Sequence, residues 1–79
     1  MKLKKEELVV KIGTKIREKR IEKGLSIEKL ANEAEIESKQ LRRIELGKIN
    51  TSIYQIYNIT HTLAIPMRDI FIFWSKPIL

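Results

Sequence analysis

The sequence predicts an all-α domain, a compact bundle of about five helices, and three observations favour this fold class. Apolar residues recur at helical spacing along much of the chain, and helix-boundary residues such as Gly24 and Ser26 fall between these stretches. The chain has 79 residues, which is near the lower size limit for a core without metal. A helical bundle or a dimer is therefore expected to supply the buried surface.

The first predicted helix covers about residues 4–23 and ends at Gly24, which serves as its C-cap. The apolar stripe of this helix consists of Val9, Ile12 and Ile16. The stripe continues onto Arg20, and a guanidinium in that position needs a partner if it is buried.

The carboxylate of Glu45 also needs a partner if it is buried, because Glu45 lies four residues after Leu41 on the core face of a later helix. The simplest solution is a bidentate pair between Arg20 and Glu45 that ties the two helices together. The alternative, in which these are two independent surface charges, stays open at this point.

The stretch from 26 to 47 organises the chain and predicts two short helices joined by a tight turn. Ser26 is the N-cap of the first, and Ala31 is small enough to let the two helices cross closely. The apolar and small residues of the first helix are Ile27, Leu30, Ala31 and Ala34, and those of the second are Leu41 and Ile44. Residues 35–38 break the period. The second helix keeps a polar, basic face formed by Lys39, Gln40, Arg42 and Arg43.

A fourth helix is predicted after the polar loop at residues 48–52, with Ser52 or Thr51 as its cap. Its predicted buried side consists of Ile53, Ile56, Thr60 and Leu63. A second stripe, Tyr54, Tyr57 and His61, could cover a neighbouring helix or face solvent. Pro66 suits the first turn of a fifth helix running from Met67 to about Trp74.

The C-terminal segment 66–79 is more apolar than an end helix of so small a monomer can bury. Ile70 and Phe71 are expected to plug the core, which leaves Phe73 and Trp74 for an interface to which Ile70 also contributes. The segment is therefore a predicted dimerisation segment. A rival interpretation, insertion into a lipid surface, lacks flanking basic residues beyond Lys76.

Composition argues against most enzyme and metal chemistry. The chain has no cysteine and one histidine, so we expect no disulfide framework, no metal site and no cofactor. No nucleophile–base pair or glycine-rich phosphate loop occurs, so His61 is expected to be a surface or packing residue and the chain no enzyme. With no signal peptide and no apolar run of membrane-spanning length, a cytoplasmic protein without a membrane partner is expected.

The net charge of +6 favours a polyanion as partner. Residues 1–23 carry nine Lys/Arg against four Glu, whereas residues 24–50 carry five of each sign. Within 26–47 the acids lie mainly on the first helix and the turn, and the bases on the second helix and just after it. The second helix is therefore the basic element of the stretch.

The stretch 26–47, with Leu30-Ala31 near its start and Ile44-Glu45-Leu46-Gly47 at its end, resembles the helix-turn-helix of the phage repressor and Cro-like regulators, the XRE family. The likeness extends over roughly residues 12–71. It implies one lambda repressor-like DNA-binding domain spanning 1–79, in which Arg and Glu at the positions of Arg20 and Glu45 form a pair.

The resemblance also implies a function: a transcriptional regulator that binds double-stranded DNA as a homodimer, through the major groove of a near-palindromic operator. Restriction-modification controller proteins and some antitoxins are similarly small, and the sequence does not choose between them. The alternative is a protein-interaction module, such as an antitoxin whose apolar C-terminal segment binds a partner protein.

Helix geometry and the resemblance together assign DNA-contacting residues. The predicted base-contacting residues are Ser38, Lys39, Gln40, Arg42 and Arg43. The predicted phosphate-contacting residues are Ser26, Lys48, Asn50, Thr51 and Ser52. The alternative for Arg42 and Arg43 is a solvated helix face.

Three positions depart from the family pattern. Ile27 stands where many relatives have a Gln that contacts phosphate, and Glu35 stands where the turn usually has a left-handed Gly. Keeping the same turn geometry with Glu35 costs about 1 kcal/mol. Glu37 suits the dipole of the second helix but brings negative charge towards the DNA phosphates. Weak or salt-sensitive binding is the expected consequence.

Overall fold

The computed structural model describes residues 2–72. It contains four α-helices and one 3₁₀ helix, listed in order as α1 (Lys5–Glu22), α2 (Ile27–Glu33), α3 (Ser38–Glu45), α4 (Ile53–Leu63) and η1 (Met67–Phe71). No strand occurs between residues 2 and 72, and the predicted all-α class is confirmed. The predicted fifth helix is a short 3₁₀ turn instead of an α-helix, and Phe73 and Trp74 lie outside the described residues.

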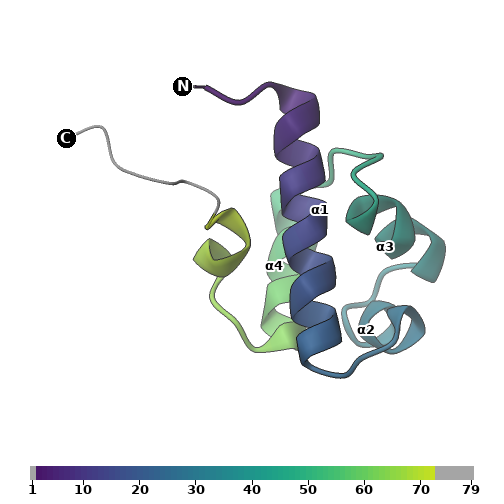
Figure 1. Ribbon diagram of the computed structural model, residues 1–79. Helices are drawn as coiled ribbons and strands as arrows, with labels where there is room; N and C mark the ends of the chain where they lie inside the picture. Colours follow the sequence, from purple (N-terminus) through teal and green to yellow (C-terminus); the bar gives the residue numbers. More distant parts are fainter. Residues whose placement is uncertain (1, 73–79) are drawn as a thin grey trace.

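Figure 1 shows α1 running through the middle of the molecule, with α2 and α3 on one side of it and η1 on the other. The helix α4 packs against α1, α2 and η1, while α3 packs against α1 and α2. The helix α3 thus packs mainly against α1 and α2, and its residues Lys39 and Arg43 stay exposed.

All four α-helices end in the same way, with a residue of positive φ followed by a backbone hydrogen bond that closes the last turn. The four residues and their φ angles are Gly24 (72°), Glu35 (61°), Gly47 (72°) and Ala64 (58°). In each case the next amide donates to a carbonyl five residues back, as in the 2.9 Å bond from Ile36 to Ala31. This is the Schellman arrangement, and it confirms the left-handed turn predicted at Glu35.

The residue after each left-handed position contributes to the core at three of the four ends. Leu25, Ile36 and Ile65 all pack against the central cluster of buried side chains. The fully buried large apolar side chains are Ile16, Leu30, Leu41, Ile44, Ile59, Leu63 and Ile70. The helix ends thus direct the connecting loops inward as well as ending the helices.

Three predictions about burial are wrong. Ile53 is 79% exposed, because it is the first residue of α4 and lies beyond the packed surface, and Ile59 takes part in the core instead. Phe71, the last residue of η1, is 40% exposed and does not plug the core. Ile70 does plug the core and has no exposed surface, so its predicted contribution to a dimer interface is wrong.

The absence of a side chain at Gly13 lets α1 and α3 approach closely. A Cβ atom on Gly13 would lie 2.8 Å from the carbonyl oxygen of Glu45 and closer still to that of Ile44. Because both carbonyls belong to the last turn of α3, Gly13 determines how near α3 lies to α1. The sequence pattern drew attention to Ala31 but not to this glycine.

Candidate nucleic-acid interface

The outward face of α3 carries two cations. Leu41, Ile44 and Glu45 bury the inner face of this helix, and Lys39 and Arg43 lie opposite them on exposed positions one turn apart. Neither of the two cationic side chains makes a hydrogen bond or an ion pair to any residue between 2 and 72. Both charges are therefore available to an anionic partner.

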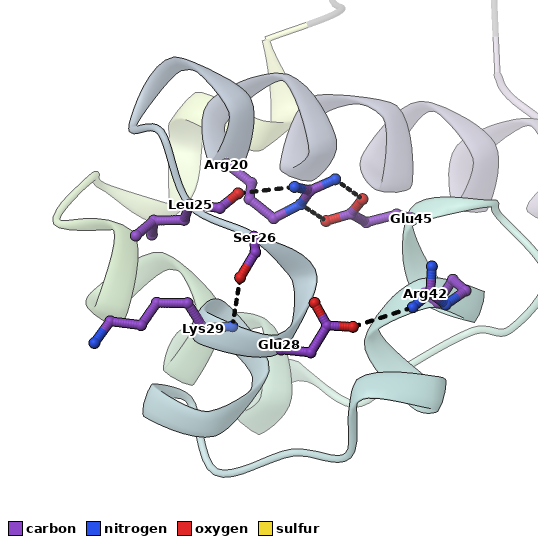
Figure 2. A network of polar contacts seen from close by, with 7 residues as sticks. All are labelled: Arg20, Leu25, Ser26, Glu28, Lys29, Arg42 and Glu45. Atoms are coloured by element: carbon purple, nitrogen blue, oxygen red, sulfur yellow. Dashed lines mark hydrogen bonds and ion pairs between the residues drawn. The ribbon is translucent and has the colours of Figure 1, made fainter.

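The flank of α3 that faces α2 carries Arg42. Its guanidinium Nη2 lies 3.4 Å from Oε2 of Glu28 on α2, as Figure 2 shows. Both side chains are exposed, so this ion pair adds little to stability. It does direct Arg42 towards α2, away from the line of Lys39 and Arg43.

The opposite flank of α3 carries Gln40, which is half-buried. Its amide Nε2 donates a 2.8 Å hydrogen bond to Oε1 of Gln55 on α4, and the hydroxyl of Thr51 donates to the same oxygen. The sequence pattern did not single out Gln55, although a Ser-x-x-Gln spacing from Ser52 marks a helix start. Four of the five predicted base-contacting residues thus divide into an outward pair, Lys39 and Arg43, and two flanking residues that have partners within the chain.

Ser38 is the first residue of α3 and is half-buried. It follows Glu37, whose side chain makes no capping hydrogen bond to the helix. The amides of the first turn of α3 are therefore uncapped by Glu37, and the positive end of the helix dipole lies beside the outward cations.

The pair of Arg20 and Glu45 holds the end of α3 to α1. Nε and Nη2 of Arg20 donate to the two oxygens of Glu45 at 2.7 and 3.0 Å, and Nη1 donates to the carbonyl of Leu25 at 2.8 Å (Figure 2). These hydrogen bonds to Glu45 raise the pKa of the Arg20 guanidinium, so it stays charged. One guanidinium therefore joins α1, α3 and the loop that leads into α2.

One of the predicted phosphate-contacting residues, Ser26, is the cap just before α2, and the other four lie in the loop between α3 and α4. The hydroxyl oxygens of Ser26 and Ser52 accept hydrogen bonds from the amides of Lys29 and Gln55, at 3.0 and 3.1 Å, and so cap α2 and α4. In this arrangement each hydroxyl keeps its own hydrogen for another acceptor. Lys48 and Asn50 are exposed on the loop between α3 and α4.

Other kinds of site find little support in the part of the chain that the structure describes. Within residues 2–72, no three side chains of His, Asp or Glu are grouped so that they could hold a metal ion. None of the helices in that range is both long enough and apolar enough to span a lipid bilayer.

Comparison with known proteins supports the same motif. A family model described as helix-turn-helix matches residues 16–70. The structure of the restriction-modification controller protein C.AhdI from Aeromonas hydrophila is similar, with a TM-score of 0.78 and 35% sequence identity, over 80% of this chain and 96% of that one. A search of curated protein sequences found no match.

Two structures of the clp gene regulator ClgR from Corynebacterium glutamicum are also similar, with TM-scores of 0.81 and 0.80. Each shares 25% sequence identity over 82% of this chain, and the match covers 69% of one ClgR chain and 84% of the other. Since the family model covers well over half of the chain and includes α2 and α3, the protein belongs to the XRE family of helix-turn-helix, DNA-binding transcriptional regulators.

Proposed function

We propose that this regulator binds a near-palindromic operator as a homodimer, with α3 of each protomer in the major groove. The observation that carries the proposal is the pair Lys39 and Arg43, exposed and unpaired among the described residues on the outward face of a helix whose other face is buried. Lys or Arg bonded to O6 and N7 of guanine is the commonest specific contact to DNA. We therefore expect G-containing half-sites.

Within this proposal the other base-contacting residues act from the flanks of α3. Arg42 exchanges the Glu28 carboxylate for DNA, and this exchange costs little because both side chains of the ion pair are exposed. Gln40 keeps its bond to Gln55, while Ser38 offers a hydroxyl at the start of the helix. The proposed phosphate contacts come from Ser26, Lys48, Asn50, Thr51 and Ser52. Thr51 contributes its backbone amide, because its hydroxyl donates to Gln55.

A dimer is supported by large apolar side chains that are exposed among residues 2–72. Three of these side chains, Ile53, Tyr54 and Tyr57, lie on α4. A fourth, Phe71, is the last residue of η1. Phe71 and the exposed Ile72 lead directly into Phe73 and Trp74 in the proposed dimerisation segment 66–79. Pairing these surfaces about a two-fold axis removes apolar area from water and matches a two-fold symmetric operator.

The similarity to C.AhdI supports a more specific role, that of a restriction-modification controller protein. The matched region covers almost all of C.AhdI and 80% of this chain, at 35% identity. Under this proposal the operator lies in the promoter region of the regulated restriction-modification genes.

Gel-shift measurements at two salt concentrations, combined with sedimentation, test the proposal. We expect a dimer that shifts a palindromic promoter fragment more strongly than unrelated DNA, with an affinity that falls steeply as salt rises. If the chain is monomeric and shifts no DNA even at low salt, the alternative holds, in which the apolar surface binds a partner protein.

A further inference from the structure

The side chain of Gln55 connects two elements that the proposed function places on DNA. Its Oε1 accepts from Nε2 of Gln40, on the flank of α3, and from the hydroxyl of Thr51, in the loop between α3 and α4. The residues are separated by 15 positions in the first case and 4 in the second. One carbonyl oxygen therefore joins the base-reading helix to the loop proposed to hold phosphate.

The local sequence would favour a different position for this side chain. Gln55 is the third residue of α4 after the cap Ser52, and a Gln in that position usually reaches back to the amide of the cap residue. Here the capping interaction is one-sided: the Gln55 amide donates to Ser52 Oγ, while the Gln55 side chain bonds Gln40 and Thr51 instead. The interaction with α3 replaces a local one that was available.

We propose that Gln55 is a positioning residue for DNA recognition, which sets the depth and rotation of α3 in the groove relative to the phosphate contacts of the loop. The inference rests on the proposed function. Gln55, Gln40 and Thr51 are all half-buried, where a hydrogen bond is less weakened by competing water than at an exposed site. Phosphate held by the loop thus aligns the first turn of α3 through Gln55.

The proposal predicts that the effects of removing the Gln55 and Gln40 side chains are coupled. If Gln55 aligns α3 through Gln40, removing either side chain breaks the same connection, and removing both does little further harm. If Gln55 only stabilised the fold, its loss would weaken binding to every sequence alike. Sequence preference, measured separately from affinity and stability, therefore distinguishes positioning from a structural role.

The experiment compares Gln55→Leu with the wild type in a selection of binding sites from random duplexes, followed by affinity measurements on the selected site and on single-base variants. We expect Gln55→Leu to lose about tenfold in discrimination at the base pairs next to the first turn of α3. Gln40→Leu should lose at least as much, because Gln40 is itself a proposed base contact, and the double variant should be no worse than Gln40→Leu alone. In Gln55→Glu the carboxylate still accepts both bonds, so its selected sequence should stay that of the wild type while its overall affinity falls through repulsion of phosphate.

Asn58→Leu is the matched control, because Asn58 lies one turn further along α4, is half-buried, and makes no side-chain hydrogen bond within residues 2–72. Thermal denaturation of all variants verifies that they are folded at the binding temperature. The inference is overturned if Gln55→Leu discriminates as well as Asn58→Leu, or if the Gln40 and Gln55 losses are additive. A wild type that selects no sequence would instead contradict the proposed function itself.

Discussion

Arg20 and Glu45 lie 25 residues apart in the sequence, and they join α1 to the last turn of α3 through two hydrogen bonds of 2.7 and 3.0 Å. Their side chains are 12% and 4% exposed. We predict that Arg20→Met costs about 3–5 kcal/mol of stability, because the Glu45 carboxylate stays buried without its partner. Urea denaturation of the wild type and the variant measures this difference.

The double variant Arg20→Met/Glu45→Leu is the control for that prediction. It removes both charges and fills the space with apolar groups, so most of the lost stability should return. A double variant that is no more stable than Arg20→Met would mean that the bond from Arg20 to the carbonyl of Leu25, and not the ion pair, holds this corner together.

Gly13 and Gly24 respond differently to the same substitution. In Gly13→Ala the new Cβ would collide with two backbone carbonyls of α3, so we predict a loss of about 3 kcal/mol or more and a displaced α3. At Gly24 no described residue other than its two chain neighbours comes within 4 Å of the added Cβ, and only the φ of 72° opposes the change. Gly24→Ala should therefore cost about 1 kcal/mol. Equal losses in thermal denaturation would contradict the close approach at Gly13.

Glu35 and Ala64 occupy left-handed positions without being glycine, with φ angles of 61° and 58°. We predict that Glu35→Gly and Ala64→Gly each stabilise the fold by about 1 kcal/mol, reduced slightly by the greater freedom of glycine in the unfolded chain. The control is Glu33→Gly, in the exposed last turn of α2, which should destabilise by about 1 kcal/mol. A denaturation midpoint that falls in Glu35→Gly would show that the carboxylate has a stabilising role at this turn.

Much of this fold could be predicted because its signals are local. Ser26, Gly24 and the spacing of Leu30, Ala31 and Ala34 depend on a few neighbouring residues. The pair of Arg20 and Glu45 followed from charges on two apolar stripes that had to face each other. Ala64 gave no such signal, since alanine favours a helix and nothing in its side chain marks a left-handed end.

The parts that could not be predicted depend on tertiary contacts. Gly13 matters because of two carbonyls about thirty residues away, and Gln55 matters because α4 brings it beside Gln40. The exposure of Ile53 and Phe71 reflects how far the neighbouring helices extend, which helical periodicity does not contain. For the same reason the sequence could not show that Arg42 and Gln40, on the two flanks of α3, have partners on α2 and α4.

The outward position of Lys39 and Arg43 leads to a prediction about specificity. Lys39→Ala and Arg43→Ala should each weaken binding to the preferred site by about 1–3 kcal/mol and relax the preference at one base position. Lys48→Ala, which alters a proposed phosphate contact on the loop, should lower affinity for all sequences alike and reduce the salt dependence. Site selection with each variant is the measurement. An unchanged preferred sequence in the first two variants would show that these side chains do not read bases.

The last prediction concerns the dimer. Phe73 and Trp74 can each bury about 150–250 Å², so the double variant Phe73→Ala/Trp74→Ala should weaken dimerisation while the fold of residues 12–71 is retained. Binding to a palindromic site should fall steeply, because two recognition helices about 34 Å apart engage successive major grooves only when they are linked, and the second then binds at high effective concentration. Sedimentation of the variant at micromolar concentration is decisive. If it remains dimeric, the interface lies elsewhere, and the exposed Tyr54 and Tyr57 on α4 are the next residues to replace, since their removal should then separate the protomers.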